Sequence, residues 1–363
     1  MKYDICIKGG GPAGSLLAKL LAERGWKTLL FEGSDYSRPR VGETLAAQVP
    51  ALLKSCNLEK EFASIPSKPS HGIYSAWTEN EFVFKSHILN AAGHTLHVDR
   101  RDFDLMLFNA AHKAGVNTYK KARVQHVERQ SSCWEINWQG DSGHQTGQTG
   151  IFIDATGRKS AQRSKSLFAA QQFDQLVGIG ITPLPFAAPS KGLALKTCEY
   201  GWWYLSPLSA TTSVVLLMTD LDLAKKHSLL TYATWKQLFP EDEFFGLVKQ
   251  QLGSKRALQV KPAHSQIVRS IHVDGFMAVG DALCSFDPIS GSGVLRALQT
   301  ARGLARWLTS HPDLTASSIV PFLNQTEELY SNYLEQCQRV YSLVNFWENS
   351  PFWLRRKELL MAA

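Results

Sequence analysis

Glycines near the amino terminus are the residues whose types and spacing most directly indicate chemistry. Gly9, Gly11 and Gly14 form a G-x-G-x-x-G pattern, with Pro12 and Ala13 inside it. In this pattern the first glycine makes a tight turn, the second lets backbone approach a pyrophosphate, and the third lets a helix pack closely on a strand. The following helix would present free N–H groups to that pyrophosphate. We therefore expect these five residues to form a dinucleotide-binding turn.

An acidic residue stands where such a site needs one. Glu32 follows the apolar run 28–31 and comes 18 residues after Gly14. A carboxylate at this place accepts hydrogen bonds from both hydroxyls of an adenosine ribose and disfavours a 2′-phosphate. The pattern indicates FAD or NAD and leaves the choice between them open.

A second glycine-rich segment lies far along the chain and bears on that choice. The apolar run 276–279 ends in Gly280 and Asp281, ahead of a helix-like run over 294–308. A turn lies between these runs and contains Pro288, Gly291, Ser292 and Gly293. This arrangement resembles the flavoprotein monooxygenases of the aromatic-hydroxylase type. The resemblance implies FAD, with Gly280 and Asp281 at the ribityl chain and the turn against the isoalloxazine ring.

Two arginines fit the same resemblance. The run 100–107 is similar to the family's Arg-x-x-Phe-Asp-x-x-Leu helix start, which implies that Arg100 lies near the FAD phosphates. Arg40, within 38–43, is similarly placed in the family. A guanidinium group suits phosphate through its forked hydrogen bonds.

The segment 154–163 resembles the family's Asp-Gly motif. The resemblance implies that Asp154 and Gly157 contribute to FAD binding, and Val124 is included among the expected FAD contacts. Thr156 stands where the hydroxylases carry an aspartate that serves FAD and reduced nicotinamide. This departure argues against tight, direct use of NADPH.

Within the family, Gly-Glu-Thr at 42–44 and the run 201–208 resemble the tryptophan-halogenase branch. The lysine that halogenases use for hypohalous acid should fall near Ser70, whereas Lys68 lies two residues too early. A compact relative without this lysine resembles the LodB/GoxB-type flavoproteins. Those proteins are required for cysteine tryptophylquinone formation in amine-oxidising quinoproteins.

The resemblance implies an FAD-dependent monooxygenase that hydroxylates an electron-rich aromatic group, the favoured substrate being a tryptophan of a precursor quinoprotein. O2 and an external reductant, either reduced flavin or NAD(P)H, would be co-substrates, and the partner would be a protein. The alternatives are a halogenase with a shifted lysine register, a geranylgeranyl-reductase-like lipid reductase, and an FAD-bearing chaperone without turnover of its own.

Few side chains are candidates for catalysis. His71 and His264 are the expected proton handlers, because their positions in the sequence place them near the presumed pocket. Trp202, Trp203 and Tyr204 could line an aromatic pocket that stacks an indole. Structural roles compete with these functional ones for all five residues.

Elements that would position these residues follow an α/β order. We expect a discontinuous Rossmann-like FAD-binding domain, a mixed-sheet substrate domain and a helical C-terminal segment. The FAD-binding domain is predicted over residues 1–75, 98–165 and 260–310. The substrate domain is predicted over 76–97 and 166–260, and the helical segment over 311–363. The polar stretch 140–150 is expected to be a mobile hairpin loop.

Composition sets wider bounds. The 363 residues are 44% hydrophobic, carry a net charge of +7 and include six scattered cysteines without a Cys-x-x-Cys pair. The pattern predicts free thiols, no metal site and a cytoplasmic location. No apolar run approaches the roughly 20 residues of a membrane span, and no signal peptide is expected. We expect no nucleic-acid partner and a monomer or weak dimer.

Overall fold

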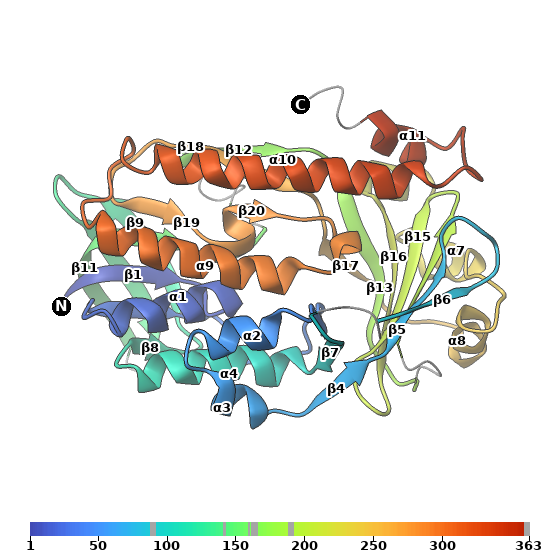
Figure 1. The fold of residues 1–363 in the computed structure, drawn as a ribbon, viewed down its shortest axis with the longest axis horizontal. Helices are drawn as coiled ribbons and strands as arrows, with labels where there is room; N and C mark the ends of the chain where they lie inside the picture. Colours follow the sequence, from blue (N-terminus) through green and yellow to red (C-terminus); the bar gives the residue numbers. More distant parts are fainter. Residues whose placement is uncertain (88–91, 141–142, 159, 161–165, 188–191, 359–363) are drawn as a thin grey trace.

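The computed structural model describes residues 1–87, 92–140, 143–158, 160, 166–187 and 192–358. A large sheet lies at each end of the molecule, and helices cover the sheet that contains the amino terminus (Figure 1). The helix α10 (Val320–Ser342) runs along one side of the molecule from the first sheet toward the second. This helix therefore connects the two ends of the molecule.

The first sheet contains the strand–helix–strand unit that the glycine pattern predicts. The buried strand β1 (Lys2–Lys8) leads into α1 (Pro12–Ala22), and β2 (Thr28–Phe31) pairs with β1 in parallel. The other parallel strands are β8 (Asn117–Tyr119), β11 (Gly143–Asp154) and β19 (Phe276–Ala278). Ligands of such sheets bind at the carboxyl ends of the strands.

Two antiparallel strands extend this sheet and change one expectation. β9 (Arg123–Arg129) and β10 (Trp134–Gly140) pair with each other, and β10 pairs with the first half of β11. The expected hairpin loop over 140–150 is wrong for Gly140, which ends β10, and for residues 143–150, which belong to β11; residues 141–142 lie outside the described part of the chain. Gln145, for example, pairs with the buried Trp138. The polar residues of β11 therefore form regular backbone pairs with β10.

The second sheet has seven strands. In spatial order they are β17 (Gln259–Pro262), β13 (Leu176–Leu184), β16 (Ser213–Asp220), β15 (Gly201–Pro207), β14 (Leu193–Cys198), β5 (Gly72–Ala76) and β6 (Val83–Ser86). Within the described residues, β14 and β5 pair in parallel and the other neighbours in this sheet pair antiparallel, so the sheet is mixed as expected. The strands β5 and β17 cross the predicted domain boundaries near residues 75 and 260. The division into domains stays a prediction.

Smaller elements join the two large sheets. One three-stranded sheet consists of β3 (Thr44–Leu45), β7 (Thr95–Val98) and β4 (Ser67–Ser70). Another consists of β12 (Phe168–Gln172), β18 (Gln266–Ile271) and β20 (Cys284–Ser285).

Short and long helices pack on both large sheets. Those near the first sheet are α2 (Val49–Lys54), α3 (Glu59–Ala63), α4 (Arg100–Lys113) and α9 (Gly293–Ser310), with the 3-10 turns η1 (Gly280–Ala282) and η2 (Pro288–Ser290). Those beside the second sheet are α6 (Leu221–Lys226), α7 (Tyr232–Gln237) and α8 (Phe245–Gln251). Trp203 of β15 packs against Trp235 of α7 in a separate hydrophobic core.

The C-terminal segment is helical, as predicted, and is attached to the second sheet. After α10, the helix α11 (Pro351–Glu358) buries Phe352 and Trp353 completely. Arg356 is buried beside them and forms an ion pair with buried Asp220, with 2.7 Å between Nη2 and Oδ1. A buried pair of this kind is costly to break because one charge would stay without its partner.

The predicted fold class is confirmed by these elements. A Rossmann-like sheet, a mixed second sheet and a helical C-terminal segment are all present. None of the helices in the described part of the chain has the length and apolar character needed to cross a bilayer.

Candidate cofactor and active site

A cavity of about 1070 Å³ lies where the two large sheets face each other. Most of the residues predicted to bind a cofactor line it. They are Gly9, Gly11, Pro12, Ala13, Glu32, Arg40, Arg100, Val124, Gly157, Asp281, Pro288, Gly291, Ser292 and Gly293. The structure thus brings together segments that are separated by more than 250 residues in the sequence.

The three glycines of the first turn have different environments. Gly9 has φ of +119°, and a Cβ there would lie 2.4 Å from the Ala155 carbonyl oxygen. A Cβ on Gly14 would lie 2.0 Å from the Gly9 carbonyl oxygen, behind the cavity wall. At Gly11 a Cβ would meet no atom within 4 Å. Gly9 and Gly14 therefore shape the turn, whereas Gly11 keeps space open beside the backbone.

The cavity wall contains stretches of backbone that no side chain covers, and these show whether the cavity suits FAD. Like Gly11, the cavity-lining Gly157, Gly291 and Gly293 have no atom within 4 Å of an added Cβ. The amino termini of α1 and α9 lie at these surfaces, and neither N-cap residue makes a side-chain capping bond. Backbone N–H groups and helix dipoles there suit a pyrophosphate and an electron-rich ring. The donor set therefore fits FAD.

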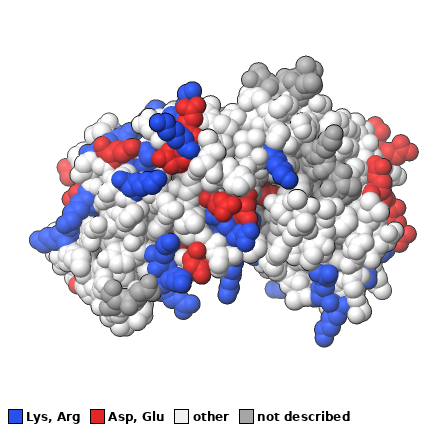
Figure 2. All heavy atoms as spheres, turned by 90° about the horizontal axis from the view of Figure 1, so that it is seen from below, with Lys and Arg blue, Asp and Glu red and all other residues white. Residues whose placement is uncertain are grey.

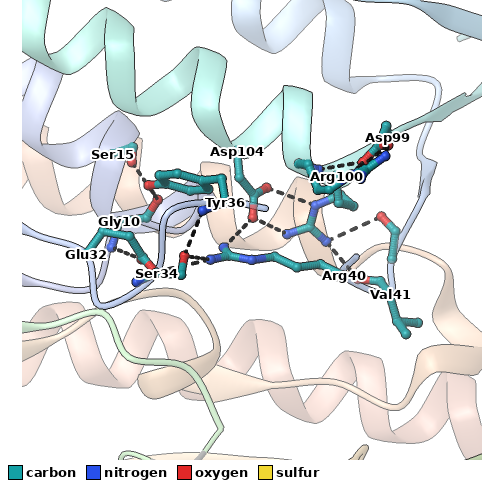
Figure 3. Close-up of polar contacts among 12 residues, drawn as sticks. Gly10, Ser15, Glu32, Ser34, Tyr36, Arg40, Val41, Asp99, Arg100 and Asp104 are labelled. Carbon is teal, nitrogen blue, oxygen red and sulfur yellow. Dashed lines mark hydrogen bonds and ion pairs between the residues drawn. The ribbon is translucent and has the colours of Figure 1, made fainter. Parts of the chain in front are cut away.

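Glu32 is fixed at the end of β2. Its carboxylate accepts hydrogen bonds from the backbone N–H groups of Gly10, at 3.0 Å, and Ser34, at 2.9 Å. Nη2 of Arg40 lies 3.1 Å from the same carboxylate (Figure 3). This orientation holds the carboxylate on the cavity wall, where a ribose would need it.

Arg40 and Arg100 share one buried acid (Figure 3). Nη1 of Arg40 lies 2.7 Å from Asp104 Oδ2, and Nε of Arg100 lies 2.9 Å from Asp104 Oδ1. Arg100 also donates to the Val41 carbonyl oxygen at 3.1 Å. Asp104 lies within the predicted helix motif over 100–107, but no role was predicted for it. Its i,i+4 spacing from Arg100 was the available signal.

The Asp-Gly segment lies at the end of β11. Asp154 is buried behind the wall, where it accepts from the backbone N–H of Thr156 at 2.8 Å and from the Ser160 hydroxyl at 2.6 Å. Ala155, Thr156 and Gly157 line the cavity, but Asp154 does not. Asp154 therefore orders the turn that reaches the cavity. Positions 159 and 161–165, which include part of this motif, lie outside the described residues.

Arg158 has a role that the sequence analysis missed. Its Nε lies 3.2 Å from Asp281 Oδ2, and its other nitrogens donate to the carbonyl oxygens of His264 and Phe286. Arg158 thereby connects the turn after β11 to the segment that contains Asp281, the residue predicted to bind the ribityl chain. Gly280 lies behind this wall, where a Cβ would be 2.6 Å from the Ala13 Cβ.

The second sheet supplies an apolar wall. Trp202 and Tyr204 of β15 line the cavity, whereas Trp203 faces the core on the opposite side because adjacent residues of a strand point to opposite faces. The expectation that Trp203 lines the pocket is therefore wrong. The apolar neighbours of Trp202 on the cavity wall are Ile73, Leu193, Leu195, Leu216, Met218, Pro262, Ala263 and Ile289.

Tyr204 is paired with Glu43, a fully buried acid. The Tyr204 hydroxyl donates to Glu43 Oε1 at 2.5 Å, and the Gly42 N–H donates to Oε2 at 3.0 Å. Burial and the Glu43 carboxyl raise the pKa of Tyr204 well above its usual value. The phenol therefore stays protonated and neutral, and Tyr204 contributes an uncharged aromatic ring to the cavity wall.

Asp287 is another buried acid, and it lines the cavity next to Pro288. The Ile289 N–H donates to its Oδ1 at 2.9 Å, and the Tyr341 hydroxyl donates to its Oδ2 at 2.7 Å. Burial, followed by the nearby Asp174 carboxyl, raises the pKa of Asp287 to about 6. The sequence analysis did not select this residue.

The two predicted proton-handling histidines lie elsewhere. His71 is exposed, and its ring contacts that of His94 at a centroid distance of 5.5 Å. His264 is buried, with Nε2 3.2 Å from Gln266 Oε1, and burial lowers its pKa. Among the described residues the histidine that lines the cavity is His87, which sequence reasoning missed. The geometry gives no support to His71 or His264 as proton handlers.

Together, the glycine turn, Glu32, the second glycine turn and the apolar wall line one cavity and are the features expected of a flavoprotein. The chain matches the FAD binding domain family over residues 2–318 and belongs to that family. It is also similar to LodB of Marinomonas mediterranea, a protein named as an FAD-dependent oxidoreductase. The two are 32% identical over 362 residues, which cover 98% of this chain and 96% of LodB.

Solved structures share the fold. The flavin-dependent halogenase CmlS superposes with a TM-score of 0.79 at 22% identity, covering 100% of this chain and 70% of CmlS. The peptidyl tryptophan dihydroxylase QhpG, described as essential for tryptophylquinone cofactor biogenesis, superposes with a TM-score of 0.76 at 19% identity. That match covers 98% of this chain and 79% of QhpG. The predicted resemblance to FAD-dependent enzymes of this group is confirmed, and the chain is an FAD-dependent oxidoreductase.

Proposed function

We propose that this oxidoreductase is a monooxygenase that hydroxylates a tryptophan side chain of a precursor quinoprotein during cysteine tryptophylquinone formation. The observation that carries the proposal is one continuous cavity, lined on one side by the FAD elements and on the other by the apolar wall around Trp202. The similarity to LodB over nearly the whole chain supports the same class. QhpG, which shares the fold, is named for a peptidyl tryptophan substrate.

In this proposal one side of the cavity binds FAD and the other side binds the substrate. Glu32 and the backbone at Gly11 would hold the adenosine and diphosphate parts of FAD, and the 288–293 turn would lie beside the flavin ring. Bound FAD, once reduced by an external reductant, supplies the electrons that activate O2. The apolar wall would exclude water and orient an indole by ring packing against Trp202 and Tyr204.

Halogenation is the alternative that shares the fold. Lys68, the lysine nearest the expected register, is an exposed residue of β4 and is not among the cavity-lining residues. Moving it to the cavity would require β4 to leave its pairing with β7. The geometry therefore favours hydroxylation over halogenation. A lipid reductase would share the FAD elements but would not depend on O2.

A protein substrate would have to approach the surface around the cavity. Figure 2 shows basic and acidic side chains intermingled over the lobe of the first sheet, while the lobe of the second sheet is largely uncharged near the junction between them. An uncharged surface suits a polypeptide better than a nucleic acid. Cytoplasmic location and a monomeric or weakly dimeric state stay predictions.

Coexpression with a candidate precursor quinoprotein from the same genome tests this function. Mass spectrometry of the precursor should find one or two added oxygen atoms on a tryptophan, and O2 uptake should rise when the precursor is present. Gly11→Ala, which should fold but bind FAD more weakly, is the matched control and should leave less of the tryptophan modified.

Three results would contradict the proposal. An unmodified tryptophan in aerobic, reducing conditions with FAD-loaded enzyme would exclude this substrate. Halogen in place of hydrogen in a parallel culture with bromide would establish the alternative. Turnover that persists without O2 would favour a reductase.

A further inference from the structure

A chain of buried hydrogen bonds joins the two sides of the cavity through the C-terminal helix. The Trp202 indole Nε1–H donates to the Tyr341 hydroxyl at 3.0 Å, and this hydroxyl donates to Asp287 Oδ2 at 2.7 Å. Trp202 belongs to β15, Tyr341 to α10 and Asp287 to the turn before α9. All three side chains are at least 95% buried, and Trp202 and Asp287 line the cavity.

Tyr341 is suited to this link because a phenol both accepts and donates one hydrogen bond. Its hydroxyl uses both capacities, one toward each wall, in a region that water does not reach. The same helix makes a second contact with the turn, since the backbone N–H of Asp287 is paired with the Tyr333 hydroxyl at 2.5 Å. The turn is therefore held by its backbone and by its side chain.

The ring of Tyr341 is also held in place by other aromatic side chains. It packs against Trp77, Trp353 and Phe352, with ring centroids 5.8, 5.9 and 6.2 Å away. The guanidinium of buried Arg356 lies 5.3 Å from the same ring. Close packing on every side leaves the hydroxyl one position, which fixes the separation of its two hydrogen-bond partners.

We propose that Tyr341 is a positioning residue that locks the flavin-side turn at Asp287 to the substrate wall at Trp202, so that the two sides of the cavity form one rigid unit. This role depends on FAD binding by the chain and not on the identity of the substrate. It assigns the C-terminal helix, which lies outside the family's matched region of 2–318, a direct part in the geometry of the site.

Tyr341→Phe tests the proposal with purified protein and FAD alone. The variant keeps the packed ring and loses both hydrogen bonds. We expect FAD binding to weaken by about three- to tenfold, as for the loss of one buried hydrogen bond. The visible circular dichroism of the bound flavin should change, and iodide should quench flavin fluorescence more strongly as the turn loosens.

Tyr330→Phe is the matched control. Tyr330 lies on the same helix and is equally buried, but its hydroxyl donates to the Ser285 carbonyl oxygen at 2.9 Å. We expect this control to bind FAD within about twofold of the wild type, because its bond reaches neither Trp202 nor the Asp287 carboxyl. Its flavin spectrum should be unchanged. Equal spectral changes in both variants, or none in Tyr341→Phe, would overturn the proposal.

Trp202→Phe keeps the test decisive if Tyr341→Phe does not fold. It removes the indole N–H donor from the other end of the link, together with part of the ring, and should change the flavin spectrum in the same direction. If both variants fold, the double variant should show the spectral change of Tyr341→Phe alone, because both substitutions interrupt one connection. Additive changes would contradict a shared link. No assay here uses a substrate, so failure of the hydroxylation proposal would leave these results unaffected.

Discussion

Asp287 shows how burial sets the properties of a single residue at this site. Its carboxyl group begins the turn beside α9 and has a pKa raised to about 6, mainly by burial. In the unfolded chain the same group has the ordinary value of 3.8. The folded protein therefore holds a proton on Asp287 between about pH 4 and pH 6 that the unfolded chain has released.

This difference predicts a pH-dependent effect of Asp287→Asn. As pH rises from about 4 to 6, the wild type loses stability because the unfolded chain releases the Asp287 proton that the folded protein still holds, whereas the variant has no such proton. The free energy of unfolding of the variant relative to the wild type should therefore increase over this window, by on the order of 1–3 kcal/mol. Denaturant unfolding at a series of pH values measures it. A relative stability that is flat across the window would show that Asp287 has an ordinary pKa.

Most residues that belong to a local sequence motif line the cavity, whereas residues with distant partners were not indicated by the sequence. Glu32 and Gly11 belong to a short motif whose spacing fixes their surroundings. Glu43 and Tyr204 are 161 residues apart, and only folding brings their oxygens together. Asp287 and Tyr341 are 54 residues apart, and neither residue's neighbours indicate the other.

At the scale of elements, the turn between β1 and α1 contains one glycine that the fold requires and another that leaves room for a ligand. Gly14 is packed against the Gly9 carbonyl oxygen, whereas Gly11 faces open space. Both glycines belong to one motif, yet only one of them leaves room for a ligand. Substituting each by alanine should therefore have opposite consequences.

Gly11→Ala should leave the free energy of unfolding of the FAD-free protein within about 0.5 kcal/mol of the wild type. It should weaken FAD binding by about tenfold or more, because the methyl group enters the diphosphate space. Gly14→Ala should destabilise the FAD-free protein by about 2 kcal/mol or more through overlap with backbone. Unfolding curves and FAD titrations give both quantities. Normal FAD binding by Gly11→Ala would place the diphosphate elsewhere.

The spacing of hydrophobic residues predicted helices and strands better than it predicted loops. The runs of β1, α1 and β2 are long and regular enough to be recognised, as were the strand before Gly280 and the helix after Gly293. The stretch 143–150 is polar and contains several glycines, so its composition indicated a loop, but pairing with β10 makes it a strand. Tertiary pairing outweighed local composition there.

At the scale of the molecule, the C-terminal helix α11 is held to the second sheet through Arg356 and Asp220. Both side chains are almost fully buried, whereas neighbouring Arg355 reaches the same acid with a side chain that is 45% exposed. The two arginines thus form a natural comparison between a buried and an exposed ion pair.

Arg356→Met should lower the free energy of unfolding by about 3–5 kcal/mol, because Asp220 would keep a buried charge with one partner fewer. Arg355→Met should cost less than about 1 kcal/mol, since its side chain is 45% exposed and its shorter ion pair, at 2.7 Å, is with the partly exposed Asp222 carboxylate. Hydrogen exchange should show lost protection in β15 and β16 for the first variant only. Equal costs for the two variants would mean that burial does not decide the strength of this attachment.

Because the site is assembled from both ends of the chain, its order of synthesis matters. Roughly 330 residues separate Gly9 from Tyr341, so at about 5–20 residues per second the glycine turn leaves the ribosome some 15–65 seconds before its distant support. The link from Trp202 through Tyr341 to Asp287 can therefore form only after the C-terminal helix has been synthesised.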